Sequence, residues 1–168
     1  MKNVVLIGMP GSGKSTLGVV LAKVMCYSFV DTDLIITKKA GMPLQKILDK
    51  NGLDRFLELE QEAGESLECE STVIATGGSM VLSEKAMKHL AENSVVVFID
   101  VPLKEIKRRV TNLSTRGIAF HSGDTLDDVF DERVPLYEKY ADVKVVFENA
   151  TDIENTVDKI YEKIKYLL

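Results

Sequence analysis

The stretch VVLIGMPGSGKST at residues 4–16 constrains the fold more than any other part of this chain. It starts with four consecutive apolar residues and continues into a glycine-rich turn that ends on one lysine and two hydroxyl residues. A short and wholly apolar run of this kind is typical of a strand that is buried on both faces. In residues 14–25 the apolar side chains then recur at helical spacing. We therefore predict a buried strand that turns tightly into a helix.

The turn itself, residues 8–15, matches the phosphate-binding pattern G-x-x-x-x-G-K-[ST] at every fixed position. Its glycines let consecutive backbone N–H groups point toward a phosphate, and the following helix N-terminus adds partial positive charge. The lysine of this motif reaches the β- and γ-phosphates, and the hydroxyl after it is a ligand for Mg²⁺. We therefore predict a nucleoside triphosphate site in which Lys14 is catalytic and Ser15 binds the metal. The expected nucleotide-binding residues are Gly8, Gly11, Ser12, Gly13, Lys14, Ser15 and Thr16.

Further apolar segments predict the rest of the sheet. Four more strands are expected at residues 27–33, 71–78, 94–100 and 143–147. Between them lie charged stretches with apolar residues at intervals of three and four, such as 44–67, which is interrupted near Asn51-Gly52. Strands that alternate with helices form parallel sheets covered on both faces. We therefore predict an α/β fold of three layers, with a five-stranded parallel sheet between helices.

Composition limits the organisation and the partners of the chain. Its 168 residues with 45% hydrophobic content suit one domain over residues 1–168, large enough for a core without disulfides or a structural metal. The formal net charge of −5 argues against general binding to nucleic acid or anionic membranes. Cys26 and Cys69 lack the spacing of a metal or redox site. We expect a cytoplasmic monomer that acts on a small molecule.

Two carboxylates in FVDTD, Asp31 and Asp33, end the expected second strand. Alternation along a strand would place them on one face, and in doubly wound sheets this end of a strand borders the ligand crevice. A phosphoryl-transfer site needs one carboxylate for the metal and one to orient the attacking hydroxyl. The alternative is that the pair caps the following helix. Beside the glycine-rich loop, the pair favours a catalytic role.

Three weaker signals accompany this pair. Gly77 and Gly78 follow the expected third strand, where paired glycines allow a ligand to approach the backbone closely. Arg116 and Arg133 are candidates for bracing a phosphate or a substrate anion, although a lone arginine more often makes a surface ion pair. Arg116 lies in residues 111–125, a polar segment with little periodicity, and loops of this length are commonly functional.

In order and spacing, these motifs resemble the shikimate kinase family along nearly the whole chain. The resemblance is carried by Gly8 to Ser15, DTD at 31–33, Glu60 in FLELE, TGGS at 76–79, Arg109, Arg116 and ERVPLYEKYA at 132–141. It implies a P-loop NTPase fold like that of nucleoside monophosphate kinases, with ATP and Mg²⁺ as cofactors. It also implies a helical acceptor-binding region at 34–70 and a mobile lid at 112–124.

The resemblance assigns roles to residues on both sides of the expected site. On the nucleotide side it implies that Asp31 is an indirect metal ligand, that Arg109 lies against adenine and that Arg116 is a catalytic lid arginine that binds the phosphates. On the acceptor side it implies that Asp33 is catalytic and contacts the acceptor hydroxyl. The remaining residues implied to bind the acceptor are Gly77, Gly78 and Arg133, of which Arg133 binds the acceptor carboxylate.

Four positions depart from the family pattern. Leu57 stands where the pattern F-R-x-x-E has an arginine that helps to bind the shikimate carboxylate, and Arg55 faces nearly the opposite side of a helix. Ser79 replaces the third glycine of G-G-G, Thr37 an acidic residue, and Gly117 a proline after the lid arginine. Because most of these lie on the acceptor side, we expect a divergent acceptor site in which Leu57 weakens shikimate binding.

The motifs therefore favour ATP-dependent phosphorylation of a hydroxyl on a small polar metabolite, with shikimate, giving shikimate 3-phosphate, as the first candidate. The alternatives are a kinase for another hydroxy acid, a sugar acid or a nucleotide, or a non-catalytic ATP-binding regulatory module. A nucleotide acceptor would need several arginines for a second phosphate, but residues 34–70 contain only Arg55. The presence of Asp31, Asp33, Arg116 and Arg133 argues against a non-catalytic module.

Overall fold

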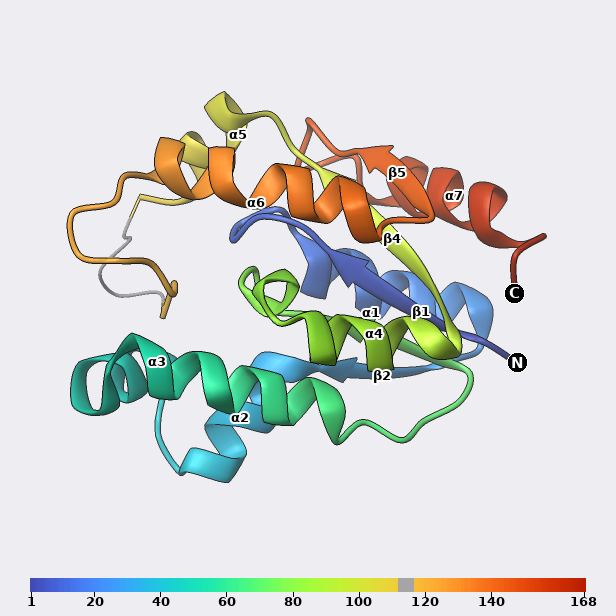
Figure 1. Cartoon of the computed structure of the whole chain (residues 1–168). Coiled ribbons are helices and arrows are strands. Elements are labelled where there is room, and N and C mark those ends of the chain that lie inside the picture. The colour runs from blue at the N-terminus through green and yellow to red at the C-terminus, as the bar shows by residue number, and fades with distance from the viewer. Residues whose placement is uncertain (112–116) are drawn as a thin grey trace.

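Five strands form a sheet in which all neighbouring strands are parallel, in the order β2-β3-β1-β4-β5 (Figure 1). The computed structural model describes residues 1–111 and 117–168. The strands are β1 (Asn3–Ile7), β2 (Ser28–Asp31), β3 (Thr72–Ala75), β4 (Ser94–Asp100) and β5 (Val143–Val146). The completely buried strand β1 lies at the centre, where Val5 pairs with Ile74 of β3 and Val96 of β4. The predicted five-stranded parallel sheet is confirmed.

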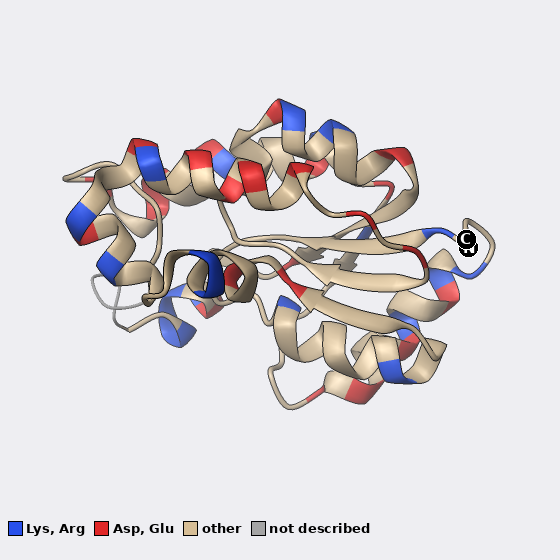
Figure 2. Ribbon diagram, turned by 90° about the horizontal axis from the view of Figure 1, so that it is seen from below, with Lys and Arg blue, Asp and Glu red and all other residues tan. Residues whose placement is uncertain are grey.

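Helices cover both faces of this sheet. They are α1 (Lys14–Met25), α2 (Thr32–Ala40), α3 (Leu44–Glu65), α4 (Glu84–Glu92), α5 (Leu103–Arg109), α6 (Leu126–Tyr140) and α7 (Ile153–Ile164), with a short 3₁₀ helix, η1 (Met80–Leu82). Helices α1 and α7 pack together on one face, and α4 and α6 cover the other (Figure 1). Lys, Arg, Asp and Glu residues lie mainly on the helices and loops, and few lie on the strands (Figure 2). This is the predicted three-layer arrangement.

Helices α2 and α3 pack against each other beside the sheet and have a core of their own. Buried side chains from both helices, among them Ile36, Phe56 and Leu59, form this second cluster. Helix α3 is kinked at Gly52, whose backbone has φ of 79°, at the interruption that the sequence predicts. The region 34–70 is thus mainly helical, while its role in binding an acceptor stays a prediction.

The ends of two strands differ from the prediction. Strand β2 ends at Asp31 and β3 at Ala75, so both are shorter than the expected 27–33 and 71–78. Asp33 lies in the first turn of α2, and the interpretation that Asp31 and Asp33 share one face of an extended strand is wrong. The physical reason is that Asp31 caps α2, since its Oδ1 accepts a hydrogen bond from the Asp33 backbone N–H at 2.9 Å.

No helix within the described part of the chain combines the length and the apolar character that crossing a membrane requires.

Candidate active site

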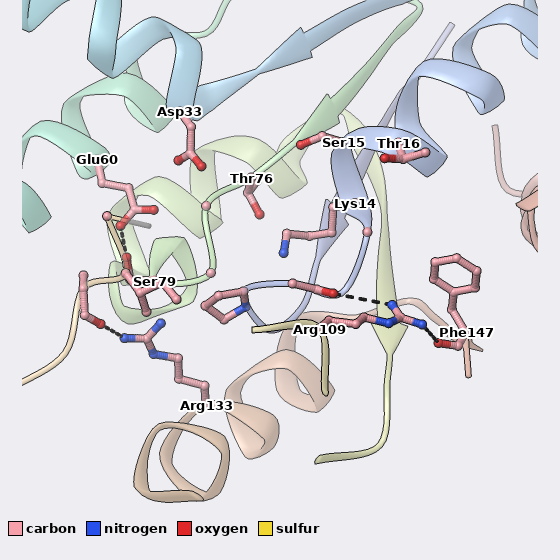
Figure 3. A pocket seen from close by; sticks show the side chains of 18 of the residues that line it. Lys14, Ser15, Thr16, Asp33, Glu60, Thr76, Ser79, Arg109, Arg133 and Phe147 are labelled. Carbon is pink, nitrogen blue, oxygen red and sulfur yellow. Dashed lines mark hydrogen bonds between the residues drawn. The ribbon is translucent and has the colours of Figure 1, made fainter. Parts of the chain in front are cut away.

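At the carboxyl ends of the strands, an open cavity of about 560 Å³ joins segments that are far apart in the sequence. Lys14 lies near its centre, with Asp33, Glu60, Ser79 and Arg133 on one side and Arg109 and Phe147 on the other (Figure 3). We call the first side the acceptor half, defined by Asp33, Glu60, Gly77, Gly78, Ser79 and Arg133. We call the second side the nucleotide half, defined by Lys14, Ser15, Thr16, Arg109 and Phe147.

Lys14 is held by the loop that precedes it. Its Nζ donates hydrogen bonds to the carbonyl oxygens of Gly8 at 2.8 Å and Met9 at 2.9 Å, and to Ser12 Oγ at 3.1 Å. Burial lowers the pKa of Lys14 to about 8, against the opposing effect of nearby carboxylates, of which Asp33 has the largest. The ammonium is therefore positioned and partly desolvated, which strengthens its attraction for a phosphate in the cavity.

The two predicted metal-binding residues are in direct contact. Ser15 Oγ donates a hydrogen bond to Asp31 Oδ2 at 2.6 Å, which brings the start of α1 against the end of β2. Hydroxyl and carboxylate oxygens are donors that Mg²⁺ prefers, and this ion usually keeps several of its waters. The donor set therefore fits a hydrated Mg²⁺ ion beside Lys14.

The acceptor half holds two carboxyl groups and a buried guanidinium. Burial, with a smaller contribution from Asp31, raises the pKa of Asp33 to about 6, and burial raises the pKa of Glu60 to about 7. The Ser79 hydroxyl donates a hydrogen bond to Glu60 Oε2. Arg133, only 3% exposed, donates a hydrogen bond to the carbonyl oxygen of Ala119. This half can therefore bind both a hydroxyl group and an anion.

At Gly77 and Gly78 the backbone lies so close to neighbouring groups that a side chain would not fit. A Cβ on Gly77 would overlap Glu60 Oε1 and would lie 2.9 Å from Asp33 Oδ1. A Cβ on Gly78 would lie 2.7 Å from Pro10 Cδ. Larger residues here would displace the acidic groups of the acceptor half or the phosphate-binding loop.

In the nucleotide half, Arg109 joins three parts of the chain. Its Nη1 donates to the Gly11 carbonyl at 3.4 Å, its Nη2 to the Phe147 carbonyl at 3.1 Å, and its Nε to Glu105 Oε1 at 2.8 Å. The guanidinium also lies over the Phe147 ring, 4.8 Å from its centroid. A flat cation and an aromatic ring at one wall suit a planar base.

Comparisons with known proteins show the family of this chain. A family model described as shikimate kinase matches residues 10–165. The chain belongs to the shikimate kinase family. It is 37% identical to the shikimate kinase of Clostridium botulinum (strain 657 / Type Ba4) over 169 residues, which cover 98% of this chain and 99% of that protein. Membership makes the chain an ATP-dependent small-molecule kinase that uses ATP with Mg²⁺.

Two further relatives define the extent of the likeness. The structure of shikimate kinase from Acinetobacter baumannii in complex with shikimate superposes with a TM-score of 0.90 at 26% identity, covering 99% of this chain and 94% of that one. Mouse threonine synthase-like 1 is 33% identical over 166 residues, which cover 98% of this chain and 22% of that protein. The chain thus spans about a fifth of this second relative and nearly the whole of the shikimate kinases named above.

The structure brings ten of the predicted site residues together around one cavity. Those that line the cavity are Gly11, Gly13, Lys14, Ser15, Thr16, Asp33, Gly77, Gly78, Arg109 and Arg133. Gly8 and Ser12 lie behind the lining, where both accept hydrogen bonds from Lys14. Leu57 does not line this cavity but borders a neighbouring hollow of about 300 Å³ that it shares with Glu60 and Ser79. The individual roles of these residues stay predictions.

The predicted lid is covered only in part. Arg116 and residues 112–115 lie outside the described residues. Ile118 and Ala119 are buried, so this end of the segment is less polar in its contacts than its sequence indicates. The reason is that Ala119 joins the α2–α3 core, while the Gly117 backbone N–H donates to Gln45 Oε1 of α3 at 3.0 Å. Closure of residues 112–124 over ATP stays a prediction.

Glu60 and Phe147 are among the lining residues that were not assigned a site role from the sequence. Glu60 appeared only as part of the family motif, and Phe147 only as the end of the expected last strand. A Cβ on Gly13 would lie 2.8 Å from Phe147 Cε1, so the ring packs directly against the phosphate-binding loop. An aromatic residue at the carboxyl end of a strand was the available signal for Phe147, but its contact with Gly13 joins residues far apart in the sequence.

We expect Gly77→Ala to weaken acceptor binding more than ATP binding. Overpacking of this kind costs roughly 1–3 kcal/mol, so the acceptor KM should rise roughly 5- to 150-fold while the ATP KM changes little. Steady-state kinetics with each substrate varied separately measures this. Gly41→Ala is the control for a general loss of stability, because its added Cβ meets nothing within 4 Å and is strained only by the backbone φ of 66°. Equal changes in both KM values for Gly77→Ala would contradict the prediction.

Proposed function

We propose that this chain transfers the terminal phosphoryl group of ATP to a hydroxyl of shikimate, giving shikimate 3-phosphate, a step of the shikimate pathway. The observation that carries this proposal is the convergence of Lys14, Asp33 and buried Arg133 on one cavity. Lys14 suits a transferring phosphate, Asp33 suits the attacking hydroxyl, and Arg133 suits a carboxylate elsewhere on the same acceptor. The similarity to a solved shikimate kinase in complex with shikimate supports the choice of acceptor.

In this mechanism the chain acts mainly by positioning and by charge. Bound ATP and Mg²⁺ supply the activated phosphoryl group, with Ser15 and Asp31 as the residues that hold the metal. Asp33 accepts a hydrogen bond from the acceptor hydroxyl, aligns its oxygen for attack and takes up the hydroxyl proton as the new O–P bond forms and ADP leaves. Lys14 stabilises the charge on the phosphoryl oxygens as the bond to the leaving group lengthens. Phosphoryl transfer needs little covalent participation by the protein, so this alignment is the main contribution of the chain.

Arg133 is suited to bind the acceptor carboxylate. Its Nη2 donates to the Ala119 carbonyl, while its buried Nε has no hydrogen-bond partner in residues 1–111 and 117–168. A buried donor without a partner costs free energy, and a carboxylate accepts bidentate hydrogen bonds from a guanidinium. Acceptor binding would therefore satisfy this donor.

A coupled assay for ADP release tests the proposal directly. The panel should contain shikimate, quinate, gluconate, homoserine and the nucleoside monophosphates. We expect shikimate to give the highest kcat/KM. Turnover of another panel member at a higher kcat/KM would reject shikimate as the acceptor. If none of the panel members led to ADP release, the proposed phosphorylation of shikimate would be rejected, and only the family membership would stand.

Leu57→Arg should raise kcat/KM for shikimate. An added arginine on α3 beside Arg133 supplies a second cation for the carboxylate, and one charge-assisted hydrogen bond contributes about 1.5 kcal/mol or more, roughly tenfold in affinity. ATP parameters should change little. Steady-state kinetics measures this, with Asn51→Arg as the control because residue 51 is exposed on the same helix.

The unmodified protein gives the complementary result. With Leu57 in place of an arginine, we expect weak shikimate binding or a preference for a related acceptor whose corresponding end is less anionic. A micromolar KM for shikimate in the unmodified protein would contradict the inference that Leu57 alters specificity. It would also show that another residue supplies the second charge.

A further inference from the structure

Ser79 makes a contact that a glycine at the same position could not make. It lies in the loop after β3, is 5% exposed, and donates its hydroxyl to Glu60 Oε2 across the acceptor half (Figure 3). The other carboxyl oxygen, Glu60 Oε1, has no hydrogen-bond partner among residues 1–111 and 117–168. In the described chain, the orientation of the Glu60 carboxyl therefore depends on a single hydrogen bond from Ser79.

Arg133 and Lys14 act on Glu60 from a distance, but within the described residues neither forms an ion pair with it. Glu60 is 1% exposed and makes no ion pair there, although burying a carboxylate is costly unless it is paired or hydrogen-bonded. One turn earlier on α3, the apolar side chain of Leu57 borders the same hollow as Glu60 and Ser79. Ser79 thus donates a hydrogen bond to Glu60 without carrying a charge, and the apolar Leu57 supplies no cation that could pair with this carboxylate.

The free oxygen of Glu60 faces the acceptor half. A Cβ on Gly77 would overlap Oε1, so this oxygen lies directly against the backbone that borders the cavity. The same imaginary Cβ would lie 2.9 Å from Asp33 Oδ1, so the two carboxyl groups lie near each other on the same side of Gly77. Asp33 and Glu60 also line the same cavity, so their carboxyl groups border one binding space.

We propose that Ser79 is a positioning residue for acceptor binding, whose hydroxyl holds the Glu60 carboxyl so that Oε1 accepts a hydrogen bond from a hydroxyl of the acceptor. The inference rests on the proposed function, because it takes the acceptor to be a small polyhydroxylated molecule. In this chain Ser79 supplies the hydrogen bond that holds Glu60, and Leu57 leaves the position next to it without a charge. The site holds Glu60 with a neutral hydrogen bond instead of an ion pair.

The protonation of Glu60 supports this arrangement. Burial raises its pKa to about 7, while the hydrogen bond from Ser79 lowers it. Of the charged groups that face it, Asp33 on α2 raises the pKa, and Arg133 on α6 and Lys14 on α1 lower it. Removing the Ser79 hydroxyl should raise the pKa of Glu60 further. A smaller fraction of the Glu60 carboxyl groups would then be ionised at neutral pH, and the protonated carboxyl accepts hydrogen bonds more weakly than the carboxylate.

A cycle of four proteins tests the inference by kinetics: wild type, Ser79→Ala, Leu57→Arg and the double variant. We expect Ser79→Ala to raise the acceptor KM roughly tenfold, the loss typical of one hydrogen bond to a charged group, without changing the ATP KM. In the Leu57→Arg background an arginine can hold Glu60, so the same change should raise the acceptor KM less than about threefold. An equal effect of Ser79→Ala in both backgrounds, or equal effects on both substrates, would overturn the inference.

Ser83→Ala is the matched control. The Ser83 hydroxyl also bonds to α3, through Gln61 Oε1 at 2.9 Å, but Ser83 does not line the active-site cavity. We expect this variant to lower thermal stability and to leave the acceptor KM unchanged. If it raised the acceptor KM as much as Ser79→Ala, a general loosening of α3 would explain both results and the inference would be rejected.

A titration that needs no turnover separates this inference from the proposed function. Carboxyl ¹³C NMR, with Glu60→Gln to assign the signal, should show a higher pKa for Glu60 in Ser79→Ala than in wild type. A raised pKa in a protein that does not phosphorylate shikimate would reject the proposed acceptor and retain the Ser79–Glu60 contact. An unchanged pKa in a protein that does phosphorylate shikimate would reject the role of Ser79 alone.

Discussion

Replacing Lys14 with alanine should lower kcat by about 10²- to 10³-fold or more, since loss of one preorganised charge contact to a transition state has costs of this size. The ammonium is already held in the cavity by the carbonyl oxygens of Gly8 and Met9, so little reorganisation is needed when a phosphate arrives. The measurement is kcat at saturating ATP and acceptor.

The variant must be shown to fold. Thermal unfolding and far-UV circular dichroism should give a folded protein, because Lys14 lies at the start of α1 and outside the apolar cluster around the sheet. Lys23→Ala is the control, since this lysine is exposed near the other end of α1 and should leave kcat unchanged. A folded Lys14→Ala variant with wild-type kcat would remove the basis of the catalytic assignment.

Asp33→Asn should lower kcat by about 10²- to 10⁴-fold, the range over which a positioned acid or base contributes, while changing the ATP KM little. Asparagine keeps the shape of the side chain at the start of α2 but replaces one carboxylate oxygen by an NH₂ group. It therefore loses the negative charge that aligns the attacking hydroxyl. Steady-state kinetics with ATP and with the acceptor varied separately measures the two effects.

Asp31→Asn provides the comparison for this result. Asp31 accepts a hydrogen bond from Ser15, so its change should raise the Mg²⁺ concentration needed for half-maximal activity. Asp33→Asn should leave that concentration unchanged. If both variants showed the same increase, Asp33 would belong to the metal site and the acceptor hydroxyl would need another partner.

The phosphate-binding loop shows how much of the nucleotide half is predictable from sequence. Lys14, Ser15 and the loop glycines lie within eight consecutive residues between a strand and a helix, so their geometry depends on local backbone conformation. Gly11 and Gly13 adopt left-handed conformations with φ of 78° and 88°, as a tight phosphate-binding turn requires. Local spacing was sufficient for the loop, because the groups that hold the Lys14 ammonium, on Gly8, Met9 and Ser12, all come from this short segment.

The acidic pair shows where local reasoning fails. Alternation along a strand predicted one shared face for Asp31 and Asp33, but the strand ends at Asp31 because its side chain caps α2. Both residues still reach the site, by different routes: Asp31 contacts Ser15, and Asp33 lines the cavity from a helix. The same residues are compatible with a strand that continues and with a cap that starts a helix. The sequence pattern does not distinguish the two, and in the structure the cap forms.

By itself, the sequence determined the α/β class, the phosphate-binding loop, the number of strands and the family resemblance, because these depend on periodicity and on motifs within short segments. Only the tertiary structure decided the strand order β2-β3-β1-β4-β5, the contact of Ser79 with Glu60, the packing of Phe147 on Gly13, and the position of Leu57 beside the cavity. The partners in each of these contacts lie on different elements. Their meeting depends on how helices and strands pack into one core, which the spacing of residues along a single segment does not specify.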